Sequence, residues 1–327
     1  MTTLRRRTTL AAAFAAALAI ALPVTGAAAA WPERPITLII PWGAGGGTDG
    51  TGRILAKMME DRLGQPINVV NRTGGGSTIG HGEIARAKPD GYTLGIITTE
   101  LSMFHWRGQS TLSHKDYTLI GLFNADPSSI HVNAASPHKD LRSLAEAIKA
   151  NPRSIKAGGA NQGGVNHLSY VGLVQAVGAA GDQAFWIPSE GAAPALQLLA
   201  SGAIDAAVVQ MSETRSLAEA GKIRPLAVMG GRRDPNFPDV PTVKEAIGID
   251  FTATGWRGLG GPKGLPADVT ATLASVMEAV VSSAEFKEFM GKRLYGVEWK
   301  GPADFAAFLA ERDESFGAAM KAAGLAK

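Results

Sequence analysis

The sequence predicts an α/β protein made of two lobes, each a parallel or mixed sheet flanked by helices. First, short apolar runs that suit strands alternate with stretches of helical period along the whole chain after residue 30. Second, this alternation comes in two series of similar size, the second beginning near Ile130. Third, glycine-rich turns follow strands in both series, which is where ligands bind in open α/β sheets.

The first series opens with a strand at Ile36–Ile40. A helix is expected next, because Thr48 or Asp49 suits its N-cap, and Asp49 is the residue we assign to that role. The apolar face of this helix consists of Ile54, Leu55, Met58 and Met59. Gly64 and Pro66 end it.

Two more strands complete this series. The second strand is Ile67–Val70, and a short helix runs from the glycines at 74–76 to about Ala87. A Pro-Asp-Gly turn at 89–91 leads into the third strand, Tyr92–Thr98. The order strand, helix, strand, helix, strand predicts a parallel sheet with covering helices.

The second series also contains both strands and helices. Its predicted strands are Ser154–Ala157, Phe185–Ile187, Ile204–Val209 and Leu226–Met229. Its predicted helices are Leu141–Ala150, Asn166–Val177, Pro194–Ala200 and Ser212–Ala220. Phe251–Gly260 is expected to be extended, and helices over Ala267–Met290 and Pro302–Ala323 close the chain.

Residues 1–30 have the three-part pattern of a secretory signal peptide. Three arginines (5–7) precede a mostly apolar run (10–24), and alanines suit a cleavage site near Ala30. A membrane anchor fits less well, because the apolar run is short and alanine is weakly lipophilic. The pattern predicts export to the periplasm by the Sec or the twin-arginine route.

Charge and cysteine content argue against several classes of function. Cleavage near Ala30 leaves 297 of the 327 residues, enough for one large or two ordinary domains. The 32 basic residues include three in the signal, so the mature chain balances its 29 acidic residues and gives no support for nucleic-acid binding. The chain has no cysteine, which excludes disulfides, lipidated cysteines and thiolate metal sites.

The glycine-rich turns at 43–47, 74–76 and 158–164 predict an anion site. Each follows a strand and precedes a helix, so its backbone N–H groups lie at a helix N-terminus and attract anions without a charged side chain. If the turns of the two lobes face each other, they form the walls of a cleft. The anion is then a phosphate or a carboxylate.

A nucleotide is one alternative. Gly45, Gly47 and Gly50 match the dinucleotide-binding fingerprint, and Arg72 suits a 2′-phosphate, which suggests an exported NADP-linked oxidoreductase. The acidic residue expected at the end of the second strand is absent, and no Lys-Ser or Lys-Thr pair follows the glycines as a P-loop requires. A small carboxylate needs only the N–H groups, with Thr48 adding a hydroxyl.

Other chemistries find little support. Ser77 follows three glycines, but Ile79 stands where a hydrolase nucleophile elbow needs glycine. The six histidines are scattered without ligand spacing, so no metal or other cofactor is predicted. His81 and His167 are expected to be structural.

Several stretches in one order resemble a single family, the periplasmic solute receptors of tripartite tricarboxylate transporters (the Bug or TctC-like family). They span the mature chain: WPERPITLIIPWGAGGGTD, GQPINVVNRTGGGSTIG, AKPDGYTLGIITT, GGANQGGVNHL, IPSEGAAPALQLLASGAIDAAV, AGKIRPLAVMGGRR, FPDVPTVKEA and GWRGLGGPKGLPADV.

The resemblance implies a type II-like Venus flytrap fold that captures a small organic carboxylate between its lobes and delivers it to a membrane transporter. It implies no catalysis. It places the first lobe at residues 31–127 and 255–327, with the second lobe, 128–254, inserted between them. The expected partners are the ligand and the integral membrane subunits of the transporter, and the expected state is a monomer.

The resemblance also implies the binding residues. Carried over to this sequence, they are Gly45, Gly46, Gly47 and Thr48, then Gly75, Gly76, Ser77 and Thr78, then Thr99 and Glu100, then Asn161, Gln162, Gly163 and Gly164, and lastly Ser189, Glu190 and Gly191. The glycine loops of the first lobe are expected to hold a proximal carboxylate.

Three departures from the family pattern lie near the distal end of the ligand. Trp42, expected to face the ligand, stands where many members have phenylalanine, the stretch 208–212 lacks their usual polar group, and Glu190 sits where lysine is common. If Glu190 points inward, it disfavours a second carboxylate and favours a cationic or hydroxylated end. The alternative interpretation is that Glu190 is a loop residue that faces solvent.

Aromatic and basic residues near the expected crossing between lobes have two interpretations. Trp106, Trp186 and Trp256 either wall the cleft or pack inside the lobes, and packing is the commoner role. Arg257 either packs at the crossing or clamps a carboxylate. For the whole protein, a carboxylate sensor that docks on a signalling partner is a third hypothesis beside the receptor and the oxidoreductase.

Overall fold

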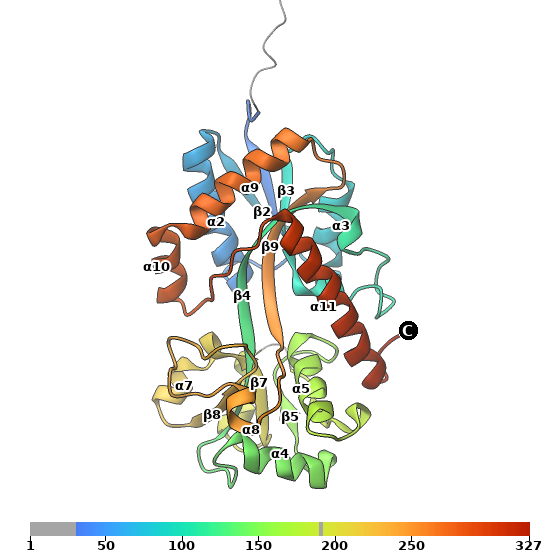
Figure 1. Ribbon diagram of the computed structural model, residues 1–327, viewed down its shortest axis with the longest axis vertical. Coiled ribbons are helices and arrows are strands. Elements are labelled where there is room, and N and C mark those ends of the chain that lie inside the picture. Colours follow the sequence, from blue (N-terminus) through green and yellow to red (C-terminus); the bar gives the residue numbers. More distant parts are fainter. Residues whose placement is uncertain (1–30, 190–191) are drawn as a thin grey trace, which may run out of the picture. The chain divides into compact units, whose positions relative to one another are not determined.

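A mixed sheet of nine strands organises the described part of the chain from Arg34 to Lys327. The computed structural model describes residues 31–189 and 192–327, so the predicted signal peptide lies outside it. Along the sheet the strand order is β2-β1-β3-β9-β4-β7-β5-β6, and β8 pairs with β4. The α/β, two-lobed prediction is confirmed: helices flank each end of this sheet (Figure 1).

The elements alternate much as the sequence predicts. The strands are β1 (Ile36–Ile40), β2 (Ile67–Asn71), β3 (Thr93–Thr98), β4 (Tyr117–Asn133), β5 (Ala157–Gly158), β6 (Trp186–Ile187), β7 (Ala206–Gln210), β8 (Ile223–Val228) and β9 (Thr254–Pro262). The helices are α2 (Gly47–Leu63), α3 (Thr78–Arg86), α4 (Leu141–Ala150), α5 (Val165–Ala176), α6 (Ala192–Ala200), α7 (Arg215–Glu219), α8 (Val243–Ile247), α9 (Ala267–Ser282), α10 (Ala284–Lys292) and α11 (Pro302–Ala322).

In the first lobe, β1 lies between β2 and β3 and is parallel to both. Ile36 pairs with Ile67 and Leu38 with Leu94, which aligns the carboxyl ends of the three strands. The helix α9 crosses one face of this sheet, with α2 beside it (Figure 1). The predicted parallel β-α-β-α-β unit is confirmed, so the turns that follow β1, β2 and β3 meet at one edge.

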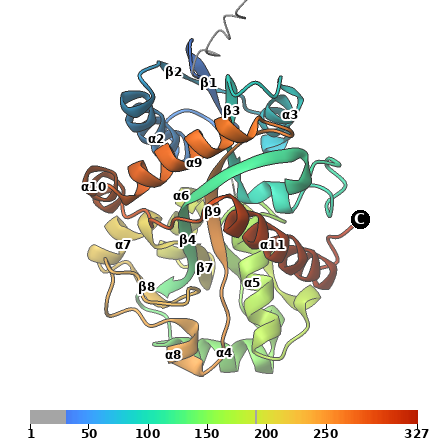
Figure 2. The same ribbon diagram turned by 45° about the horizontal axis from the view of Figure 1, so that its top comes forward.

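The long strand β4 was missing from the sequence prediction. It runs antiparallel to β9, and the two strands lie side by side as they pass from the first lobe into the second (Figure 2). The pairing with β9 extends to Pro127, and from Ser128 onward β4 pairs with β7 and β8 instead. One strand therefore belongs to the sheets of both lobes.

In the second lobe, β5 pairs in parallel with β6 and β7, whereas β7 and β8 flank the end of β4 in antiparallel pairs. Buried apolar side chains of β4, α4, α5 and β7 form its core, with Tyr170 and Trp186 among them. The lobe boundaries at 127/128 and 254/255 stay a prediction, because residues 34–327 cluster as one unit.

The predicted helix over 267–290 is wrong in one respect: it is two helices, α9 and α10. Ser283 adopts an extended backbone conformation, and its side chain accepts a hydrogen bond from the Phe286 N–H, so it caps the start of α10. The predicted helix Ser212–Ala220 is likewise divided, into a short 3₁₀ turn at Met211–Glu213 and α7. In the described residues no single helix has the length and apolar character to span a membrane, and α9 with α10 passes that test only as a pair bent by 62°.

Glycine permits the close approach of α3 to the end of β1. A Cβ atom on Gly80 would lie 2.6 Å from the Arg72 carbonyl oxygen and 2.7 Å from the Pro41 Cα, and neither backbone group can rotate away. We expect Gly80→Ala to lower the free energy of unfolding by about 1–3 kcal/mol, measured by urea denaturation.

Gly50 in α2 is the matched control. It is also a helical glycine, but no atom lies within 4 Å of where its Cβ would stand. Gly50→Ala should therefore raise stability by about 0.5–1 kcal/mol through helix propensity. Equal effects of the two substitutions would contradict the proposed close contact.

Candidate functional site

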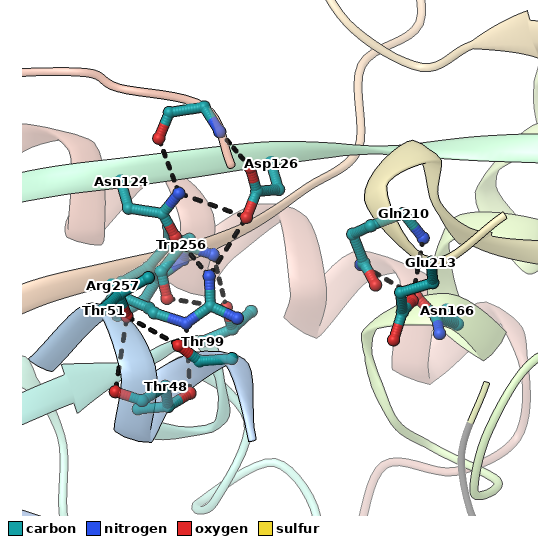
Figure 3. Close-up of polar contacts among 12 residues, drawn as sticks. Thr48, Thr51, Thr99, Asn124, Asp126, Asn166, Gln210, Glu213, Trp256 and Arg257 are labelled. Carbon is teal, nitrogen blue, oxygen red and sulfur yellow. Dashed lines mark hydrogen bonds and ion pairs between the residues drawn. The ribbon is translucent and has the colours of Figure 1, made fainter. Parts of the chain in front are cut away.

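A cleft of about 170 Å³ opens where β4 and β9 cross between the lobes. At about 30 Å³ for each water molecule, it has room for roughly six waters. The lining residues are Trp42, Thr48, Thr98, Thr99, Glu100, Asp126, Val165, Gln210, Gly255, Trp256 and Arg257. Figure 3 shows the Arg257 group and the Gln210 group on opposite sides of this space.

The Arg257 guanidinium is the centre of a polar network on the first-lobe side (Figure 3). Its Nε donates to Thr48 Oγ1 at 3.0 Å, and its Nη1 donates to the Asp126 carboxylate at 3.0 Å and to Asn124 Oδ1. Asp126 also accepts from the Gly296 N–H at 2.6 Å. The network joins the start of α2 to β4, and Arg257 remains 20% exposed to the cleft.

The first turn of α2 lies beside Arg257. The N–H groups of Gly47, Thr48 and Asp49 have no acceptor inside the helix, because the first hydrogen bond is from Gly50 N–H to the Gly46 carbonyl. A Cβ on Gly47 would lie 3.1 Å from Arg257 Nη2. The helix terminus and the guanidinium thus present positive potential together.

The assignment of Asp49 as the N-cap is wrong: Gly46 is the N-cap, and Asp49 is the third residue of α2. Asp49 is 5% exposed and accepts from the Gly45 N–H, Arg53 Nε and Asn71 Nδ2, each at 2.9 Å. Desolvation opposes its ionisation, but these three hydrogen bonds lower its pKa below the ordinary 3.8. Since Gly45 donates to Asp49, its N–H is already used within the protein.

Glu100 lies on the same side of the cleft, just after β3. Its carboxylate accepts from Thr98 Oγ1 at 2.6 Å, and that hydroxyl accepts from Trp42 Nε1 at 3.3 Å. Thr98 pairs with Arg257 in the register of β3 and β9, which makes the two side chains neighbours. Desolvation raises the pKa of the Glu100 carboxyl, opposed by the Thr98 hydrogen bond and by the charge of Arg257.

The second lobe contributes Val165 and Gln210 to the opposite wall. Gln210 Nε2 donates to Asn166 Oδ1 at 3.1 Å, and its backbone N–H donates to the Glu213 carboxylate at 3.2 Å. Desolvation raises the pKa of Glu213, opposed by that backbone hydrogen bond and by the charge of Arg257 across the cleft.

The glycine loop after β2 is strained. Gly75, Gly76 and Ser77 all have positive φ, and Ser77 is a non-glycine residue at φ 77°. The Ser77 side chain is 1% exposed, and its Oγ has no hydrogen-bond partner. His81 holds the loop, because its Nδ1 contacts the Ser77 carbonyl at 2.9 Å and its Nε2 accepts from the Thr98 N–H at 3.2 Å.

The loop of the second lobe is bound in a similar way. The Gly163 N–H donates to His167 Nδ1 at 2.9 Å, so this donor, like that of Gly45, is occupied. A Cβ on Gly163 would lie 3.4 Å from Arg107 Nε of the first lobe. The predicted residues Glu190 and Gly191 lie outside the described residues.

The three tryptophans pack inside the lobes. Trp256 is 1% exposed and packs edge-on against Phe305 and Phe308. Trp186 belongs to the core of the second lobe, and Trp106 donates its Nε1–H to the Asp313 carbonyl. The packing interpretation fits all three rings, although Trp256 is also among the residues that border the cleft.

The structure brings only some of the predicted residues to the cleft wall. Trp42, Thr48, Thr99 and Glu100 line it. Gly45, Gly46, Gly47, Gly75, Gly76, Ser77, Thr78, Asn161, Gln162, Gly163, Gly164 and Ser189 lie outside its lining. The sequence interpretation omitted Thr98, Asp126, Val165 and Gly255, and it gave Arg257 only a minor place. Asp126 and Gly255 face each other in the pairing of β4 with β9, which was not predicted.

A second hollow of about 510 Å³ lies between the loop 230–236 and residues 287–298, and Asp126 lines both hollows. Arg233, which lines this second hollow, donates hydrogen bonds to the Glu245 carboxylate and to the Pro238 carbonyl. The smaller cleft is the better candidate site, because it combines Arg257 with the α2 terminus. Among residues 31–189 and 192–327, no group of three or more histidine or acidic side chains is arranged to hold a metal ion.

Two α/β lobes that share crossing strands around a polar cleft define the class of periplasmic binding proteins, and solved structures with this fold are of that class. The chain belongs to the tripartite tricarboxylate transporter receptor family, whose pattern matches residues 51–325. This is a family of solute receptors rather than of enzymes.

Individual relatives agree with this family. The UPF0065 protein in the tcbD-tcbE intergenic region of Pseudomonas sp. strain P51 is 31% identical over 277 residues, which is 84% of this chain and 81% of that protein. A TctC solute-binding protein from Polaromonas, solved without ligand, is 31% identical with a TM-score of 0.79, covering 89% of this chain and 99% of that one.

Two related structures contain ligands, and each ligand is a dicarboxylate. Rpa4515 of R. palustris, solved with adipate, is 26% identical with a TM-score of 0.77, covering 91% of this chain and 99% of that one. MatC of Rhodopseudomonas palustris, with bound malate, is 26% identical with a TM-score of 0.71, covering 88% and 99%.

The hydrogen bonds of Asp49 predict its contribution to stability. Asp49→Ala removes a buried acceptor from three donors, so we expect the free energy of unfolding to fall by about 2–3 kcal/mol in urea denaturation. Asp61→Asn on the same helix is the control, because this exposed side chain pairs only with Lys57, and it should change stability by less than about 0.5 kcal/mol. A loss of that small size for Asp49→Ala would contradict the role given to it.

Buried histidines predict acid sensitivity. Burial lowers the pKa of His81 to about 4, of His131 to about 3 and of His167 to about 4. Because these values lie below the unfolded value of about 6.5, the unfolded state binds more protons, and stability is lost as pH falls from about 6.5. Each histidine should lower the free energy of unfolding by about 2 kcal/mol between pH 6.5 and 5, measured by urea unfolding at several pH values. His167→Gln should make that dependence shallower, and an unchanged slope would contradict the assignment.

Proposed function

We propose that this chain is an extracytoplasmic receptor that captures a small organic carboxylate in the cleft between its lobes. The observation that carries the proposal is the pairing of the Arg257 guanidinium with the N-terminus of α2, joined through Thr48 Oγ1 at 3.0 Å. Both groups attract a carboxylate, and both border the cleft. The dicarboxylates bound by related receptors support the same ligand chemistry.

A carboxylate at this position has donors of two kinds. Free N–H groups of the first turn of α2 supply backbone hydrogen bonds. Thr48 keeps its hydroxyl proton for donation, because its oxygen only accepts from Arg257. The ligand competes with Asp126 for Arg257, so binding is expected to weaken that ion pair.

Delivery of the ligand to a transporter can depend on the arrangement of the two lobes, which are joined by crossing strands. A ligand that contacts Arg257 on one lobe and Gln210 on the other favours the arrangement in which both contacts form. We propose that the membrane subunits of a tripartite tricarboxylate-type transporter recognise that arrangement. The chain would act as a monomer in the periplasm, after removal of its signal peptide near Ala30.

The oxidoreductase alternative loses its main support, because Arg72 is paired with Glu83 and the family is one of solute receptors. The sensor alternative uses the same cleft and differs only in the docking partner.

Arg257→Gln tests the carboxylate site. We expect the dissociation constant for the best carboxylate to rise at least about tenfold, because a charged donor at the cleft is lost, whereas the fold is retained. The ligand comes from a thermal-shift screen of residues 31–327 against mono-, di- and tricarboxylates, amino acids and nicotinamide nucleotides. At about a hundred times its dissociation constant, a ligand adds about 2.7 kcal/mol of stability.

Arg72→Gln is the control, since Arg72 belongs to the same lobe but pairs with Glu83 away from the cleft lining. It should leave affinity unchanged. Unaltered affinity of the Arg257→Gln protein would contradict the site, and a response to nucleotides alone would contradict carboxylate capture altogether.

A further inference from the structure

Negatively charged side chains outnumber positively charged ones in the lining of the cleft. Its lining includes two carboxylates, Glu100 and Asp126, and one cation, Arg257. Glu213 adds a third carboxylate beside the lining residue Gln210. Because Asp126 already pairs with Arg257, the lining charge without an ion-pair partner among the described residues is that of Glu100.

Glu100 is the carboxylate of the cleft lining that forms no ion pair among the described residues, although Arg257 and Arg107 both attract it electrostatically. Its carboxylate accepts from the Thr98 hydroxyl, and no ion pair to it occurs within the described residues. The nearby Arg107 does not line the cleft, and it lies close to Gly163 of the second lobe instead. A partly buried carboxylate without an ion pair favours a cationic hydrogen-bond donor in the same cleft.

The register of the sheet places this negative group next to the positive one. Thr98, the partner of Glu100, is directly opposite Arg257 on the neighbouring strand. Side chains in such positions are neighbours about 5 Å apart at Cβ. One small molecule in a cleft of about 170 Å³ can therefore touch both Arg257 and Glu100.

The second-lobe wall has the same preference. Gln210 donates its amide N–H to Asn166, and it forms a capping box with Glu213, whose carboxylate accepts from the Gln210 backbone N–H. Glu213 lies outside the cleft lining, but its carboxylate interacts electrostatically with Arg257 across the cleft. A second carboxylate on the ligand would be repelled by Glu100 in the lining and by Glu213 near it, and this repulsion costs binding energy.

We propose that the ligand is a zwitterion, a small monocarboxylate that also carries an ammonium group, with its carboxylate on Arg257 and the α2 terminus and its ammonium on Glu100. This inference rests on the proposed function and specifies its ligand class. It separates this chain from the two related receptors that were solved with dicarboxylates.

Pairs of ligands that differ only at one end provide the test. Succinate and 3-aminopropanoate, glutarate and 4-aminobutanoate, and adipate and 5-aminopentanoate each keep one carboxylate and exchange the other for an ammonium group. Isothermal titration of the wild-type protein should give at least about tenfold tighter binding for the amino acid of the preferred pair, or about 1.4 kcal/mol. Tighter binding of the diacid in every pair would overturn the proposal.

Glu100→Gln identifies the residue responsible. Glutamine keeps an acceptor for the Thr98 hydroxyl and removes the charge. Binding of the amino acid should weaken at least about tenfold, while that of its matched diacid strengthens, so that the preference shrinks or reverses. Glu83→Gln is the control, because it removes the same charge from the same lobe outside the cleft lining.

The outcomes separate the two proposals. If neither member of any pair binds and no other carboxylate does, the receptor proposal fails. If diacids bind and Arg257→Gln abolishes their binding, the receptor proposal stands and the zwitterion proposal fails. Amino-acid binding that Glu100→Gln leaves unchanged also overturns the assignment of the ammonium group to Glu100.

Discussion

The antiparallel pairing of β4 with β9 is the constraint on which the rest of the structure depends. It brings Arg257 on β9 beside Asn124 and Asp126 on β4, and this network reaches Thr48 at the start of α2. Because β4 changes partners after Pro127, the same strand that positions the cationic side chain also carries the chain into the second lobe. The cleft therefore lies where the two lobes share their backbone hydrogen bonds.

In the proposed site, side chains contribute more of the ligand contacts, and backbone N–H groups fewer, than the sequence predicted. Several glycine N–H groups that seemed available are used inside the protein, such as that of Gly45 by Asp49 and that of Gly163 by His167. These bonds fix the loops and leave fewer donors for a ligand. In the proposed site Arg257 adds a charged side chain, whereas the loops were expected to attract the anion without one, and Arg257 donates a hydrogen bond to Asp126.

Membership of a receptor family establishes the general activity, but it does not by itself specify the ligand. Glu100 lies in the lining of this cleft, and Glu213 accepts from the backbone N–H of the lining residue Gln210. An acidic wall discriminates by repulsion as much as by attraction, because a wrongly charged ligand loses its hydration without gaining a partner. The distinction between a diacid and a zwitterion is thus an electrostatic property of a few residues.

The sequence by itself determined the α/β class, the parallel unit of β1, β2 and β3, and the family, because apolar periodicity and glycine positions are local signals. Of the binding residues it proposed, Trp42, Thr48, Thr99 and Glu100 line the candidate cleft, and all four follow predicted strands. Only the tertiary structure decided the position of Arg257 and the use of each N–H group. These depend on which distant strands pair, and the register of β4, a strand without clear alternation, is set by contacts across more than a hundred residues of sequence.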